Sequence, residues 1–126
     1  MTYDQLIEKL AAVGVKPGLG NRGVWKRFAE HLSEDSEIRA AGIGLQDGAS
    51  SPVAIVVSPE NVYIGRKANM LGGFDISTKK RSAITGADVS GTLAGKLVLT
   101  STAGVVVGAH SMDKNQARKI AAELTE

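Results

Sequence analysis

The sequence predicts a mainly β fold with α-helices at both ends. We expect a seven-stranded antiparallel barrel or sandwich that is capped by a C-terminal helix and preceded by two N-terminal helices. Three observations predict this class. About seven short apolar segments alternate with turn residues between positions 37 and 110. One amphipathic segment follows them, and two segments with helical periodicity precede them. We therefore divide the chain into a helical annex at 1–35 and a β domain at 36–126.

The two N-terminal segments have the start signals and the apolar spacing of helices. Thr2 and Gln5 form a capping box, with Thr2 as the N-cap, and Gly14 is a natural stop. The first apolar face consists of Leu6, Ile7, Leu10 and Ala11. The second consists of Val24, Trp25, Phe28, Ala29 and Leu32.

From residue 38 the apolar pattern changes to that of short strands. A weak first strand of small residues at 38–44 is followed by an Asp-Gly turn at 46–52. In the third strand Val62 and Ile64 share one face and Tyr63 lies on the other. The remaining strands are expected at 53–57, 62–66, from 74, 83–89, 95–100 and 105–109, with a loop at 67–73.

The last segment is the clearest helix. Asp113 is a good N-cap, and Gln116 occupies the third helical position. The apolar stripe consists of Ala117, Ile120, Ala121 and Leu124. In a β barrel such a helix would cover one open end.

Three stretches of this pattern resemble the pleckstrin-homology (PH)-like domains of bacteria, in particular the YokE-like branch. They are VAIVVSPENVYI at 53–64, FDI at 74–76 with ITGADV at 84–89, and GKLVLT at 95–100 before the final helix. The resemblance covers about residues 35–125 and implies that 36–126 is a PH-like domain. It also implies non-enzymatic binding or scaffolding, often with self-association. PH domains that bind phosphoinositides have several basic residues in the first loop, whereas residues 46–52 contain none. A phosphoinositide pocket is therefore not supported.

The composition and the apolar runs of the sequence exclude several kinds of site and bear on where the protein is located. The 126 residues include no cysteine, which excludes disulfides, thiolate metal sites and a cysteine nucleophile. The first residues lack the pattern of a signal peptide, and the longest apolar run, at 53–57, is too short to cross a bilayer. We therefore expect a cytoplasmic protein, with peripheral membrane contact as the alternative.

No motif predicts a catalytic, cofactor or metal site. The glycines at 18, 20 and 23 match G-x-G-x-x-G, but a dinucleotide site needs a strand before them, and a helix is expected there. A flexible connector between helices is the favoured interpretation, and an anion at the start of the second helix is the alternative. His31 and His110 are favoured as surface or structural residues, and Asp75 and Asp88 as solvent-facing ones.

The basic residues of the middle segment are the first candidate binding site. Residues 66–100 contain six basic and two acidic residues. Lys79, Lys80 and Arg81 are expected on the turn after the fourth strand, and Arg66 and Lys67 join them as candidate contacts with an acidic partner or an anionic membrane surface. A solvated turn that aids solubility is the alternative for 79–81. Nucleic acid is an unlikely partner because no aromatic stacking platform lies beside this cluster.

Trp25 and Phe28 are the second candidate. Packing on the chain's own barrel is the favoured interpretation, and a role as anchors of an interface is the alternative. Taken together, the sequence favours a non-enzymatic, self-associating protein-binding module without cofactors. The alternative is a peripheral binder of anionic membrane surfaces.

Overall fold

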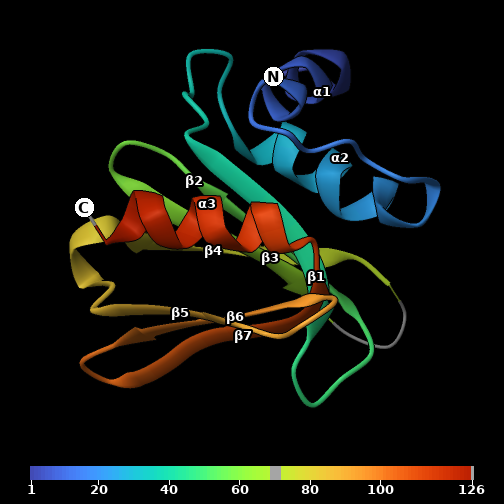
Figure 1. The fold of residues 1–126 in the computed structure, drawn as a ribbon. Coiled ribbons are helices and arrows are strands. Elements are labelled where there is room, and N and C mark those ends of the chain that lie inside the picture. Colours follow the sequence, from blue (N-terminus) through green and yellow to red (C-terminus); the bar gives the residue numbers. More distant parts are fainter. Residues whose placement is uncertain (69–71, 126) are drawn as a thin grey trace.

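The chain folds into a curled seven-stranded antiparallel sheet with helices on both of its faces (Figure 1). The structure is a computed structural model that describes residues 1–68 and 72–125. The strand order is β4-β3-β2-β1-β7-β6-β5. The helices are α1 (Tyr3–Ala12), α2 (Arg22–His31) and α3 (Lys114–Leu124), with 3-10 turns η1 (Leu19–Asn21) and η2 (Arg81–Ala83). The strands are β1 (Ala40–Gln46), β2 (Pro52–Val57), β3 (Asn61–Lys67), β4 (Phe74–Lys80), β5 (Gly86–Ser90), β6 (Gly95–Ser101) and β7 (Gly104–Met112). This architecture confirms the predicted fold class.

Local signals in the sequence determine where the first and the last helix begin. The Thr2 hydroxyl accepts a hydrogen bond from the Gln5 amide (3.1 Å), and the Gln5 side chain accepts one from the Thr2 amide (2.8 Å). The predicted capping box is therefore confirmed. At α3 the Asp113 carboxylate accepts a bond from the Gln116 amide (3.0 Å), as its N-cap role predicts.

The central strand β2 is buried on both faces of the sheet. Val53, Ile55 and Val57 point into one core, and Ala54 and Val56 point into another. This accounts for the continuous apolar run at 53–57, because a strand with two covered faces needs apolar residues at every position.

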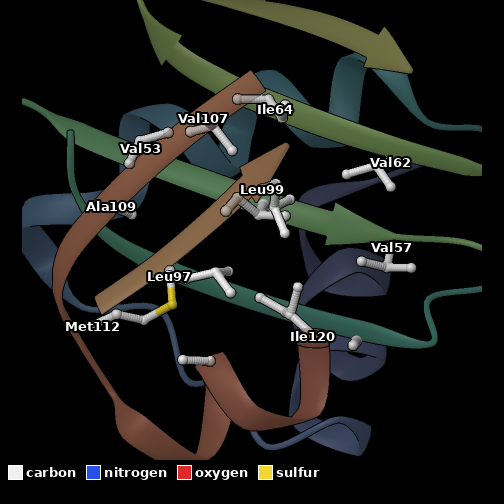
Figure 2. Packing of buried hydrophobic residues seen from close by; sticks show 13 residues of the cluster. Val53, Val57, Val62, Ile64, Leu97, Leu99, Val107, Ala109, Met112 and Ile120 are labelled. Carbon is white, nitrogen blue, oxygen red and sulfur yellow. The ribbon is translucent and has the colours of Figure 1, made fainter. Parts of the chain in front are cut away.

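The barrel core lies between β1–β3, the β6–β7 pair and α3 (Figure 2). Its completely buried members include Leu97 and Leu99 of β6, Ile55 of β2, Ile64 of β3 and Ile120 of α3. The sheet curls around this core at β1, which pairs with β2 along its length but with β7 only at Leu45 and Gln46.

The helical-layer core lies on the opposite face of β1–β3, beneath α1 and α2. Leu6 and Leu10 of α1 and Trp25 and Phe28 of α2 are completely buried there, against Ala54 and Val56 among others. The ring centroids of Trp25 and Phe28 lie 5.6 Å apart. The N-terminal helices therefore cover one face of the β domain.

Several strand boundaries differ from the predicted ones. β1 begins at Ala40 rather than at residue 38, and β7 continues to Met112 through a shift in its pairing with β6. The β5 segment begins at Gly86 because residues 81–83 form η2, in which the Ile84 amide bonds the Arg81 carbonyl (3.0 Å). Part of the loop predicted at 67–73, residues 69–71, lies outside the described residues.

The packing of α2 on β3 generates a prediction about Gly65. A Cβ atom at this position would lie 2.6 Å from Cε2 of Phe28, a ring that is completely buried. We expect Gly65→Ala to lower the free energy of unfolding by about 1–3 kcal/mol, because the buried ring has to move. Gly20→Ala is the control, since nothing lies within 4 Å of its Cβ position. Urea unfolding checks this, and equal losses for the two variants would contradict the packing described.

Candidate functional site

The outer edge of β4 is the most accessible part of the sheet. β4 pairs with β3 over all seven of its residues without a register shift, and among the described residues no strand pairs with its other side. The exposed positions of β4 are Asp75, Ser77, Thr78, Lys79 and Lys80. Such an edge has unpaired backbone groups that can add another strand.

The hydrogen bonds at the two ends of the β3–β4 ladder show which backbone groups are free. The Ala68 amide bonds the Gly73 carbonyl (3.1 Å), and the Arg81 amide bonds the Glu60 carbonyl (2.9 Å). Because an antiparallel strand alternates between inward and outward residues, residues 75, 77 and 79 bond to β3. The N–H and C=O groups of Phe74, Ile76, Thr78 and Lys80 therefore point away from the sheet.

The side chains of β4 are divided between the two faces of the sheet. Asp75, Ser77 and Lys79 lie opposite Arg66, Ile64 and Val62 of β3, so they are on the face of the barrel core. The residues at 74, 76, 78 and 80 lie on the face covered by α2. The predicted basic candidates are divided in the same way, with Arg66 and Lys79 on the first face and Lys67 and Lys80 on the second.

An open groove of about 570 Å³ lies beside β4, between the β3–β4 pair and the β6–β7 hairpin. Asp75, Ser77 and Lys79 line one side of it, and Ser101 and Val105 line the other. The groove leaves the barrel-core face of the β4 edge uncovered.

Arg66 forms part of this groove. Its Nη2 donates a hydrogen bond to the Val106 carbonyl of β7 (3.2 Å), whereas its Nε is buried and has no partner among the described residues. Arg66 therefore connects the two halves of the curled sheet, and its side chain is held in place rather than free on the surface.

Arg81 contacts the chain's own C-terminal helix. Its Nη1 donates to the Glu123 carboxylate (3.0 Å) and the Ser58 carbonyl (3.2 Å), and its Nη2 donates to the Glu123 carbonyl. The expectation that Lys79, Lys80 and Arg81 share an exposed turn is wrong. The two lysines are the last residues of β4, where they pair with Val62 and Asn61 of β3. Arg81 instead forms an ion pair with Glu123 of its own chain.

Trp25 and Phe28 are not available as interface anchors. Both are 0% exposed within the helical-layer core, which confirms the favoured interpretation, packing on the chain's own sheet. The alternative, a role as anchors of an interface, is wrong for these residues. The reason is physical: the apolar face of β2 and β3 has to be covered, and α2 supplies the largest side chains for it.

The remaining candidates have structural environments. The glycine-rich segment at 18–23 follows α1 rather than a strand, as expected, and it contains η1 and the first two residues of α2. His31 packs edge-on against Tyr63 of β3 with ring centroids 5.8 Å apart. Asp75 and Asp88 lie on β4 and β5, the two edge strands of the sheet.

The sequence did not predict one polar cluster, formed where β1, β6 and β7 meet. The Asp47 carboxylate lies 3.0 Å from Nδ1 of His110 and 3.6 Å from Nζ of Lys96. Asp47 and His110 are 63 positions apart, and no motif signals their contact. Within residues 1–68 and 72–125, no group of three or more His, Asp or Glu side chains could hold a metal ion.

Comparisons with known proteins do not extend this description. No known protein family, curated protein or solved structure matches the chain. Among the described helices, none combines the length and the apolar character needed to span a membrane.

The role of Arg81 generates a second prediction. Arg81→Ala should lower the free energy of unfolding by about 1–3 kcal/mol, because it removes charge-assisted hydrogen bonds and leaves Glu123 with one partner fewer. Lys80→Ala is the matched control, since Lys80 is exposed and should change stability by less than about 0.5 kcal/mol. Denaturant unfolding of both variants measures the difference. A loss at Lys80 as large as the loss at Arg81 would show that Arg81 has no special role.

Proposed function

We propose that this chain is a non-enzymatic protein-binding module that associates with further copies of itself through the free edge of β4. The observation that supports this function is the edge itself: seven regular residues, exposed side chains and outward backbone groups at four positions. Adding a strand satisfies these groups without any rearrangement of the fold.

The other edge of the sheet is less suited to this role. β5 has only five residues, against the seven of β4. Asp88, at the centre of β5, would face its own copy if two β5 strands paired antiparallel about their centre, and like charges directly opposite are destabilising. We therefore assign association to β4.

Binding to an anionic membrane is the alternative function, and the arrangement of the basic residues supports it less. A flat anionic surface attracts cations that are presented on one side of a protein. Here Lys79 lies on the barrel-core face and Lys80 on the α2 face, while Arg81 contacts Glu123. Lys67 is exposed but lies on the α2 face with Lys80.

Proline substitutions test the use of the β4 edge. Thr78→Pro removes an outward N–H, so the fold should persist, whereas association should weaken by about tenfold or more because the added strand loses a hydrogen bond and meets the ring. Analytical ultracentrifugation over a range of protein concentrations measures association, and circular dichroism verifies the fold. Ser77→Pro is the contrasting variant: it removes an N–H bonded to β3 and should destabilise the monomer itself.

The same samples separate the two proposed functions. A mass that rises with the concentration of the wild-type protein, and a monomeric Thr78→Pro variant, would support association through β4. A monomer at every concentration that nevertheless sediments with vesicles containing phosphatidylserine, and not with neutral ones, would replace the proposal with the membrane alternative.

A further inference from the structure

We propose that two copies of the chain pair their β4 strands antiparallel about a twofold axis at Ser77, which joins their two sheets into one. This inference rests on the proposed function and gives it a register. In this register Phe74 lies opposite Lys80 of the second copy, Asp75 opposite Lys79, and Ile76 opposite Thr78. The order of residues in β4 makes these pairs complementary in both directions.

The free backbone groups fit this register. The outward residues of β4 are 74, 76, 78 and 80, and the twofold axis at Ser77 places each of them opposite another outward residue. Two residues that face each other in this way exchange a pair of N–H to C=O hydrogen bonds. All four outward positions of each strand are therefore satisfied.

The charges fit on the barrel-core face. Asp75 would lie opposite Lys79 of the second copy, and Lys79 opposite the second Asp75, so the interface contains this contact twice. Both are pairs without hydrogen bonds between their backbones, for which the Cα atoms are only about 4.5 Å apart and the side chains are closest. Opposite charges at such a position stabilise a sheet. Both residues are exposed in the single chain and border the open groove, so they are free to meet a partner.

The side chains on the α2 face of β4 also fit the Ser77 register. Ile76 and Thr78 are both β-branched, and such residues pack well side by side on a sheet. The aliphatic part of Lys80 from one copy can pack on the half-buried ring of Phe74 from the other, while the charge of the lysine stays in water.

Nearby registers lack this complementarity. An axis at Asp75 would place two aspartates opposite each other, and an axis at Lys79 would do the same with two lysines. Lysines on an edge strand ordinarily discourage pairing between copies. In the Ser77 register each Lys79 meets a carboxylate, so the same residue favours one specific arrangement and opposes the others.

Charge reversal tests the register. Asp75→Lys and Lys79→Asp should each weaken self-association by about tenfold or more, because each replaces two attractive contacts by two repulsive ones. An equimolar mixture of the two variants should recover dimers, since each chain then supplies the charge that the other lacks. The loss of self-association should be largest at low salt. Sedimentation equilibrium and native mass spectrometry measure the species formed.

Two control variants match these charge changes elsewhere. Lys16→Asp alters an exposed lysine of the connector between α1 and α2, and Asp88→Lys alters the β5 edge, and each should change association by less than about threefold. Because Arg66 lies opposite Asp75 on β3, the thermal unfolding of every variant is measured to verify that it is folded.

The outcomes distinguish the register from the proposed function. Recovery of dimers in the mixture supports the register. Folded variants that associate like the wild-type protein, or a mixture that stays monomeric, would overturn the register, while sensitivity to Thr78→Pro would still support association through β4. Assemblies larger than dimers that are lost in Asp88→Lys would replace the twofold axis by pairing between β4 and β5. A wild-type protein that is monomeric at all concentrations would overturn both.

Discussion

The fold depends on covering both faces of β2 and its neighbours. Val53, Ile55 and Val57 need one apolar layer, and Ala54 and Val56 need another. The chain supplies the first layer with the β6–β7 pair and α3, and the second with α1 and α2 (Figure 1). The apolar residues of the N-terminal helices are therefore part of the folded β domain, and their burial is a main source of its stability.

This arrangement also limits which surfaces of the molecule are open to a partner. Because the central strands β1–β3 are covered on both sides, their side chains offer little to a partner. The polar backbone at the edge of the sheet remains accessible, and β4 presents more of it than β5 does. Binding through backbone hydrogen bonds, with charged side chains that select the register, suits such a surface because the edge has few large apolar side chains.

The sequence predicted most of the elements because their signals are local. The capping residues Thr2 and Asp113 act within one helical turn. The alternation of Val62, Tyr63 and Ile64 reflects two different cores on the two faces of β3. The weak signal of β1 has a physical cause: a Cβ at Gly44 would lie 2.7 Å from the His110 carbonyl, so close packing requires small residues there.

The candidate site was less predictable because it depends on contacts between distant parts of the chain. The C-terminal half of β4 resembles a turn in sequence, since an edge strand exposed on both faces has no apolar period beyond Ile76. The bonds of Arg81 to Glu123, 42 positions away, are equally invisible in the sequence. Trp25 and Phe28 suit a core and an interface equally in composition, and the three-dimensional packing decides for the favoured core role.

Amide hydrogen exchange along β4, followed by NMR at low and high protein concentration, tests this account most directly. The amides of residues 75, 77 and 79 bond to β3, so they should exchange slowly at both concentrations. The amides of Ile76 and Thr78 should exchange quickly in the dilute protein and become protected as it associates. Fast exchange of these two amides in a sample in which the protein is dimeric would contradict the account, because association would then use a different surface.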